Sequence, residues 1–349
     1  MTMRAFDRLL IAETARLPLS LQASLMTILG SIKIIGVSQF QIGTRDIVTL
    51  PPMAAAEQAR SVTSRLSESL WPALYEAAYS RPFSAHAPSP LATPADLDLL
   101  SQLRAAFPEG ARWSAQWQVY KVEANGSVHV RKGDCCRHVF PGAFAAASHG
   151  PVQANSNVSI LLPMASSQMQ SAFYHITGNS PHCDHDDAAL ARLYLNTRAT
   201  SVVTLMARMA GLLNTYAVPF RAKTLLDPAT YDRTDSTVFY LPRRHLPFAL
   251  SLLRDTLVEA AADLDPDVPL FSKRIADGVG GADDPGYGMS FGQTRTMLLA
   301  DAIVSAWASG DQTAQTRLEH LERRFVEESL SPNAPHLSAG NSDIYAIPA

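Results

Sequence analysis

Cysteine, charge and long apolar runs are all scarce in this chain, and each shortage excludes a class of protein. The three cysteines, Cys135, Cys136 and Cys183, are too few for the disulfide framework of a small secreted domain, and they suit a reducing cytoplasm. Charged residues make up only 17% of the chain and hydrophobic residues 47%, which favours a packed globular fold over disorder. A net charge of −3 gives no overall bias toward nucleic acid, so any site for an anion must be local.

No stretch of the sequence has the length and apolar character of a membrane span. The most apolar one, SLMTILGSIKIIG, is interrupted by Lys33 and is too short to cross a bilayer. Asp7 and Glu13 interrupt the apolar N-terminus, which therefore lacks the uncharged core of a signal peptide. We therefore expect a cytoplasmic protein without a membrane or nucleic-acid partner.

Motifs for nucleotides and metals are missing as well. The sequence has no Walker A motif, no Rossmann fingerprint and no kinase signature, so we expect no cofactor. Two short segments, CCRH at 135–138 and PHCDHDD at 181–187, combine cysteine or aspartate with histidine. Neither has the Cys-x₂₋₄-Cys spacing of a structural zinc site, so no metal is expected.

The pattern along the chain divides it into three parts. Residues 1–80 are predicted to be mainly helical, because Val62 begins a series of apolar residues at four-residue steps. Residues 81–98 are rich in Pro, Ala and Ser, which is typical of a linker or loop. Residues 99–349 combine hairpins with separate helices and lack regular strand–helix alternation. This predicts an α+β domain with a mostly antiparallel sheet flanked by helices.

Several segments of the third part alternate as strands do. One predicted hairpin turns at Asn125-Gly126, and another occupies VPFRAKTLLDPATYDRTDSTVFYL at 218–241. In the predicted strand ARLYLNTRA, alternation places four polar side chains on one face: Arg192, Tyr194, Asn196 and Arg198.

The second hairpin repeats this cationic face. Arg221 and Lys223 share one side of its first strand, and Arg233 and Asp235 share a side if the second strand extends that far. Such a surface is either a local anion site or an ordinary solvated face of the sheet.

A glycine-rich segment before the helix that begins near 291 is a further candidate. Ser290 and Gln293 form a capping box, Arg295 lies in the first turn, and Lys273 precedes the glycines. A helix N-terminus suits a phosphate, although capping alone would also explain Ser290.

Ser290 also fits the G-x-S-x-G motif of serine hydrolases. That motif needs a strand directly before it, and the preceding GVGGADDPGY is not expected to form one. His320 and His336 follow, without strands to hold an acid and a base. We therefore expect Ser290 to be a capping residue rather than a nucleophile.

Three of these segments together resemble the HopA-type effector family of type III secretion. The distinctive pieces are V-P-F-x-x-K, Y-D-R-x-D and S-F-G-Q-x-R, and the resemblance covers roughly residues 65 to 347. The same kind of domain serves as the lyase component of class V lanthipeptide and thioamitide biosynthesis. There it is thought to eliminate phosphate from phosphoserine or phosphothreonine of a precursor peptide, giving dehydroalanine or dehydrobutyrine.

The resemblance implies a phosphorylated precursor peptide and a separate peptide kinase as partners, with a cyclase as a further candidate. Lyases of another effector family use a K-x-H motif, which this sequence lacks, so no general acid is assigned. If the chain is instead a secreted effector, it need only bind phosphopeptides or proteins in a host cell, without catalysis.

The residues fit the chemistry of elimination, which needs a base, positive charge for the leaving phosphate and a donor for the developing enolate. An ordinary lysine is neutral in only about one molecule in 2,500 at pH 7, so a lysine base needs neighbouring cations. Lys223 is the predicted base, with Tyr194 and Asn196 as donors. The predicted phosphate ligands are Arg192, Arg221, Arg233, Lys273 and Arg295. The predicted supporting residues are Asp235, Ser290 and Gln293.

Overall fold

The computed structural model describes most of the chain in six stretches. These are residues 16–52, 62–86, 97–133, 135–147, 150–286 and 288–347. Most of the linker predicted for residues 81–98 lies outside the described residues, as do parts of the N-terminal region.

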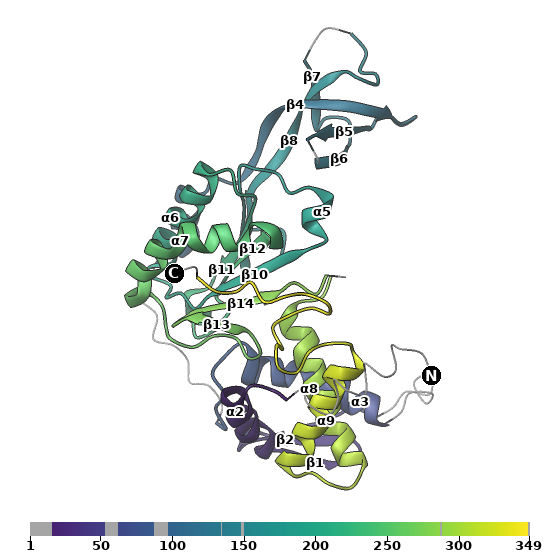
Figure 1. Ribbon diagram of the computed structural model, residues 1–349, viewed down its shortest axis with the longest axis vertical. Coiled ribbons are helices and arrows are strands. Elements are labelled where there is room, and N and C mark those ends of the chain that lie inside the picture. The colour runs from purple at the N-terminus through teal and green to yellow at the C-terminus, as the bar shows by residue number, and fades with distance from the viewer. Residues whose placement is uncertain are drawn as a thin grey trace.

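One large antiparallel sheet of eleven strands runs through the molecule (Figure 1). From one edge its strands are β13 (Lys273–Ala276), β14 (Val279–Asp283), β10 (Leu190–Leu195), β12 (Thr237–Pro242), β11 (Arg221–Leu225), β9 (Phe173–Thr177), β8 (Asn157–Ser166), β4 (Gly110–Val122), β5 (Val128–Lys132) and β6 (Cys135–Val139). The eleventh, β7 (Phe144–Ala146), pairs with β8. Together with the flanking helices, this sheet confirms the predicted α+β class.

Helices surround the middle of this sheet and fill the N- and C-terminal parts. The α-helices are α2 (Leu19–Gly30), α3 (Val62–Leu74), α4 (Leu99–Ala106), α5 (Asp184–Asp187), α6 (Val202–Thr215), α7 (Leu246–Glu259), α8 (Phe291–Ala308) and α9 (Ala314–Glu327). Tyr75–Tyr79 continues α3 as a π-helix, η2, and the short 3₁₀ turns are η3 (Pro228–Thr230), η4 (Arg243–His245) and η5 (Ala260–Asp263).

The two faces of the central strands pack against different helices, because side chains alternate along each strand. Leu193 and Phe239 belong to the core that α6 and α7 complete, and Figure 1 shows these two helices along one side of β10–β12. Tyr194 and Val238 belong to a second core, shared with α2, α3, η2, α8 and α9. The cationic residues of β10 and β11 therefore lie on the side of the sheet that faces the second core.

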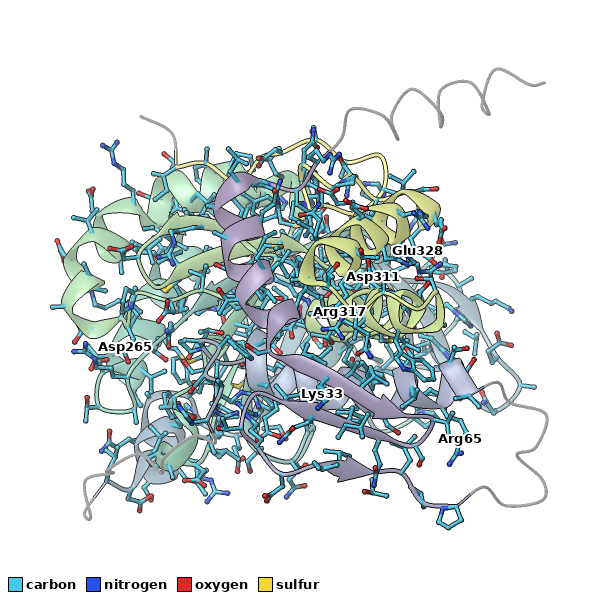
Figure 2. The ribbon with its side chains drawn as sticks, turned by 90° about the horizontal axis from the view of Figure 1, so that it is seen from below. Lys33, Arg65, Asp265, Asp311, Arg317 and Glu328 are labelled. Atoms are coloured by element: carbon cyan, nitrogen blue, oxygen red, sulfur yellow. The ribbon has the colours of Figure 1, made fainter. Side chains whose placement is uncertain are left out.

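The N-terminal part is helical, and it also contains a small sheet that the sequence did not reveal. Its strands are β1 (Ile32–Gly36), β2 (Gln39–Ile42) and β3 (Val48–Thr49). Arg317 of α9 is buried and donates to the carbonyls of Leu29 and Ile32, which tie the end of α2 to α9 (Figure 2). The N-terminal helices therefore share a core with the C-terminal ones.

The expectation that the glycine-rich stretch before Ser290 forms no strand is wrong. Residues 279–283 form β14, a buried strand between β10 and β13. A side chain at Gly281 would meet the ring of Tyr345 at 2.3 Å, so glycine is present for close packing rather than flexibility. β14 nevertheless ends at Asp283, seven residues before Ser290 (290 − 283), so no strand directly precedes the serine.

Candidate functional site

The register of the sheet places the two central cations of the predicted site on one face. Arg192 of β10 lies opposite Tyr240 of β12, and Lys223 of β11 lies opposite Val238 of β12. Lys223 is also paired with His175 of β9 on its other side. Because side chains alternate, Arg192, Lys223 and His175 all project from the same side of the sheet.

Lys223 occupies a largely desolvated position. Its Nζ lies 4.0 Å from the centroid of the Phe173 ring and donates to Oε1 of Gln170 at 3.1 Å. Burial, and after it the nearby Arg192 guanidinium, lowers the pKa of Lys223 to about 8. The amine is therefore neutral in about one molecule in ten at pH 7.

Three further charged side chains act on the same amine. Arg233 also lowers the pKa of Lys223, whereas Asp235 and Asp284 raise it. We call this group the Lys223 cluster, and its members are Lys223, Arg192, Arg233, Asp235 and Asp284. With three cations and two carboxylates, the cluster carries a net charge of +1 when Lys223 is protonated (3 − 2).

Two residues of the loop before α8, Asp284 and Met289, hold the Arg192 side chain in place. Its Nε donates to Oδ2 of Asp284 at 2.7 Å, and a terminal nitrogen lies 3.5 Å from the carbonyl of Met289. The guanidinium also lies 5.1 Å from the Tyr240 ring centroid. The side chain is buried, so a bound anion would interact with it in a weakly screened environment.

Arg233 forms a two-point ion pair with Asp235, with contacts of 2.8 and 3.0 Å. The hydroxyl of Tyr75 donates to the same carboxylate at 3.1 Å, and its ring lies 5.9 Å from the Arg233 guanidinium. The second strand does not extend as far as Arg233 and Asp235, since β12 begins only at Thr237. The connection before the strand nevertheless brings both residues to the cluster.

Tyr194 is buried on the same face as Arg192, where it accepts a hydrogen bond from the hydroxyl of Tyr79 at 3.1 Å. Burial raises the pKa of Tyr194 to about 12, with the Arg192 guanidinium opposing the rise. The phenol therefore remains protonated at neutral pH, and it can act as a donor.

Asn196 and Arg198 do not continue the cationic face, because β10 ends at Leu195. The Asn196 amide donates to the carbonyl of Asp267 at 3.1 Å, and Arg198 pairs with Asp265 at 2.8 Å. Both side chains bind the segment after η5.

The other predicted phosphate ligands bind elsewhere. Arg221 is exposed and pairs with Asp187 at 3.0 Å, while Lys273 pairs with Asp343. Arg295 is buried and donates to two backbone carbonyls, those of Pro335 and Leu337, at 2.8 Å each. In this arrangement Arg295 anchors the C-terminal segment.

Ser290 and Gln293 form the predicted capping box at the start of α8. The Ser290 hydroxyl accepts from the Gln293 amide at 3.1 Å, and the Gln293 side chain accepts from the Ser290 amide at 2.8 Å. The contact between Arg192 and Met289 shows that this helix terminus adjoins the Lys223 cluster.

Three residues at the site were missed from the sequence: Tyr75, His175 and Asp284. The Nε2 of His175 is buried without a hydrogen-bond partner among the described residues. Burial, and then Lys223, lowers the pKa of His175 below its ordinary value. Alternation in FYHIT identifies its strand, but the pairing with Lys223 depends on the register between β9 and β11, which the sequence does not specify.

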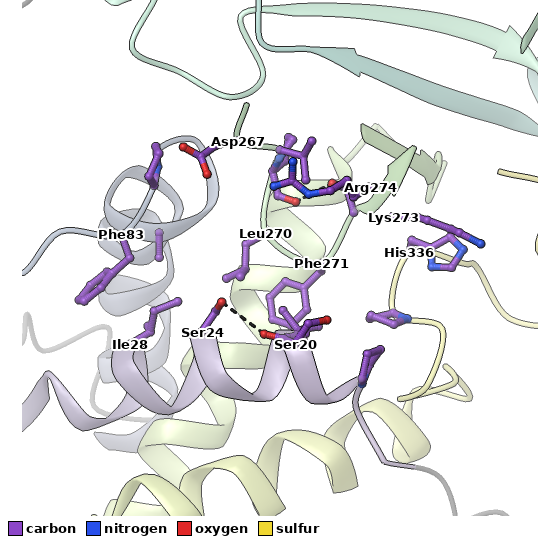
Figure 3. Close-up of a pocket in the computed structure, with 18 of the residues that line it drawn as sticks. Ser20, Ser24, Ile28, Phe83, Asp267, Leu270, Phe271, Lys273, Arg274 and His336 are labelled. Atoms are coloured by element: carbon purple, nitrogen blue, oxygen red, sulfur yellow. Dashed lines mark hydrogen bonds between the residues drawn. The ribbon is translucent and has the colours of Figure 1, made fainter. Parts of the chain in front are cut away.

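A cavity of about 660 Å³ lies away from the cluster, between α2 and the segment that leads into β13 (Figure 3). Lys273 and Arg274 line it, and each is already paired, with Asp343 and Asp277 respectively. The lysine of this lining is held by a carboxylate, whereas Lys223 has the lowered pKa that a base needs, so the Lys223 cluster is the better candidate site.

The Cys/His segments serve local contacts. The Cys183 thiol donates to Asp186 at 3.0 Å, and Cys135 lies 3.6 Å from the carbonyl of Pro181. Within the described stretches, no group of three or more His, Cys, Asp or Glu side chains is arranged to hold a metal ion. No helix in the same stretches is both long and apolar enough to traverse a bilayer.

The Lys223 cluster lies within a segment of the chain that matches a sequence family. Residues 164–337 match the HopA1 effector protein family. This HopA1-like region begins near the end of β8 and includes every member of the cluster. No curated protein matches the chain significantly.

Two solved effector structures from Pseudomonas syringae are similar to the chain. The effector of pv. tomato strain DC3000 is 14% identical, with a TM-score of 0.45, over 79% of this chain and 96% of that one. The effector of pv. syringae strain 61 is 15% identical, with a TM-score of 0.40, over 79% of this chain and 98% of that one.

Proposed function

We propose that the HopA1-like region eliminates phosphate from phosphoserine or phosphothreonine in a polypeptide, with the Lys223 cluster as its active site. The observation that carries the proposal is the Lys223 amine, whose pKa of about 8 is set by burial and by Arg192. A lysine that only clamps phosphate gains from staying charged, whereas a base must be neutral before it reacts.

The proposed reaction is a β-elimination in which Lys223 removes the proton from Cα of the phosphorylated residue. The electron pair of that C–H bond forms the Cα=Cβ double bond, and the Cβ–O bond breaks. The phosphate leaves as an anion that Arg192 and Arg233 stabilise, since guanidinium groups bind phosphate through paired hydrogen bonds. Tyr194 is assigned to hydrogen-bond the enolate oxygen that develops on the substrate carbonyl.

His175 is assigned to the leaving oxygen. Directly paired residues on neighbouring strands have Cβ atoms about 5 Å apart, which places its imidazole beside the Lys223 amine. Its unpartnered Nε2 can hydrogen-bond the departing phosphate. His175→Gln should lower kcat for elimination while leaving the Kd for phosphopeptide within about twofold, and an unchanged kcat would remove His175 from the mechanism.

Mass spectrometry of a phosphothreonyl peptide incubated with the protein tests the proposal. Elimination leaves a dehydro residue and free phosphate, and Lys223→Ala should abolish it while phosphopeptide binding persists. Lys33→Ala, an exposed lysine on β1, is the matched control and should retain full turnover. Hydrolysis back to threonine, or full turnover by Lys223→Ala, would contradict the assignment. In biosynthesis the substrate would be a precursor peptide phosphorylated by a separate kinase.

The family match supports a second candidate, a type III effector whose cluster binds phosphopeptides or proteins of a host cell without turnover. Calorimetry that detects phosphopeptide binding, with no phosphate released during long incubation, would favour this binding module over the lyase. Loss of that binding in Arg192→Gln would place it at the same cluster.

A further inference from the structure

The described residues between 110 and 166, which contain β4 to β8, form an arm that projects beyond the helices (Figure 1). Its strands enclose a small core of their own that includes Trp117, Val130 and Ile160. Tyr120 and Phe140 lie outside this core with 45% and 59% of their surface exposed. The arm is therefore stabilised from within, and its outer face is open to a partner.

Four aromatic rings form a row across this outer face. The centroids of Tyr120 and His129 are 5.8 Å apart, those of His129 and His138 are 4.4 Å apart, and those of His138 and Phe140 are 4.7 Å apart. The two imidazoles are direct partners on β5 and β6, and their planes differ by only 7°. We call these four rings the aromatic row.

Hydrogen bonds fix the middle of the row before any partner binds. His129 contacts Glu123 at 2.8 Å, and Nε2 of His138 donates to the Ser127 hydroxyl at 2.7 Å. That hydroxyl in turn donates to Asn125 at 2.7 Å. Fixed rings lose little conformational freedom when they become an interface.

The arm carries the opposite charge to the rest of the chain. Residues 110–166 contain five Lys or Arg and two Asp or Glu, a net charge of +3, so the remainder carries −6 (−3 − 3). In the described part of the chain, Arg131 bonds to the neutral Gln118 side chain and Lys132 to a backbone carbonyl. Both charges are exposed, and alternation along β5 places Arg131 on the same face as His129 of the aromatic row.

We propose that the aromatic row, together with the exposed cations at the end of β5, binds an acidic polypeptide segment of a partner protein. Exposed aromatic residues and arginine are the side chains that dominate protein interfaces, and opposite charge speeds and orients association. A long nucleic acid fits less well, because a polyanion would also meet the remaining chain with its net charge of −6. The proposal does not depend on elimination at Lys223.

Fluorescence anisotropy with a labelled, unphosphorylated peptide of Glu, Asp and Leu tests this surface on the full chain. The acidic peptide should bind at least about tenfold more tightly than a matched Gln, Asn and Leu peptide, and added salt should weaken it. Two double variants, Tyr120→Ser with Phe140→Ser and Arg131→Gln with Lys132→Gln, should each weaken binding about tenfold. Both replace exposed side chains, and circular dichroism would verify their folding.

The matched control is Phe248→Ser with Arg254→Gln on α7, an exposed aromatic and an exposed cation outside the arm. It should bind within about twofold of the unchanged protein. Three results would each overturn the proposal: absent or equal binding of the acidic peptide, arm variants that bind like the control, and tighter binding of single-stranded nucleic acid than of the peptide.

Discussion

At the scale of single residues, the position of Lys223 predicts a particular pH dependence. The base must be neutral, so kcat/KM for elimination should rise with pH until the pKa of about 8 is passed. Arg192→Gln removes a neighbouring positive charge and leaves Asp284 unpaired, and both effects raise the pKa of Lys223. The ascending limb of the pH–rate profile should therefore move to higher pH.

Asp235→Asn should shift the same limb the other way, because Asp235 raises the pKa of Lys223 in the unchanged protein. Arg254→Gln, on the exposed surface of α7, is the control and should leave the limb in place. Profiles that coincide for all four proteins would show that Lys223 is not the titrating base.

Arg233 offers a second test at this scale. Arg233→Ala should weaken phosphopeptide binding, with a loss of binding free energy on the order of 2–4 kcal/mol. The reason is that a guanidinium contact to a dianion is lost in a partly desolvated site. Arg233→Lys should not restore it, since an ammonium cannot reproduce the paired geometry. A lower melting temperature with unchanged binding would instead make Arg233 a structural residue.

At the scale of elements, the π-helix η2 brings Tyr75 and Tyr79 to the site by packing on α8. A side chain at Gly292 would meet the Tyr79 ring at 2.3 Å and the Tyr75 ring at 2.6 Å. Gly292→Ala should therefore destabilise the protein by about 1–3 kcal/mol and displace Tyr75 from Asp235. Chemical denaturation measures the first effect, and elimination kinetics measure the second.

Gly211 on α6 provides the matched control, because nothing lies within 4 Å of the side chain that it would acquire. Gly211→Ala should stabilise the protein by about 0.5–1 kcal/mol, the ordinary gain for alanine inside a helix. Equal effects at both positions would show that η2 and α8 are not closely packed at Gly292.

The same elements show what local sequence can and cannot predict. Alternation and turn residues predicted β10, β11 and the hairpin at Asn125-Gly126, because these signals lie within a few neighbouring residues. β14 was not predicted because glycine normally disfavours strands. Glycine is needed at position 281 because the Tyr345 ring, far away in the sequence, packs where a side chain would lie. His175 was missed because its place beside Lys223 depends on strand register, which is a tertiary property.

At the scale of the whole molecule, Asp283 holds the C-terminal segment onto the sheet. This buried carboxylate accepts hydrogen bonds from the Ser338 amide, the Asn341 side chain and the Tyr345 hydroxyl, and it also pairs with Arg243. Asp283→Ala should therefore reduce the free energy of unfolding by about 3–5 kcal/mol, since several buried donors lose their acceptor.

Urea denaturation measures this loss, with Asp277→Ala as the control. Asp277 forms an exposed ion pair with Arg274, and its removal should change stability by less than about 1 kcal/mol. Similar losses for the two variants would mean that Asp283 contributes no more to stability than a surface carboxylate.

The partners of Asp283 also set the order in which the protein can fold during translation. Tyr345 is made 62 residues after Asp283. Arg295 likewise cannot donate to the carbonyls of Pro335 and Leu337 until those residues have been made. Until the segment that carries these partners has emerged from the ribosome, β14 therefore lacks the contacts that satisfy its buried carboxylate. We expect protease protection of the sheet to appear only after the segment up to Tyr345 has left the exit tunnel.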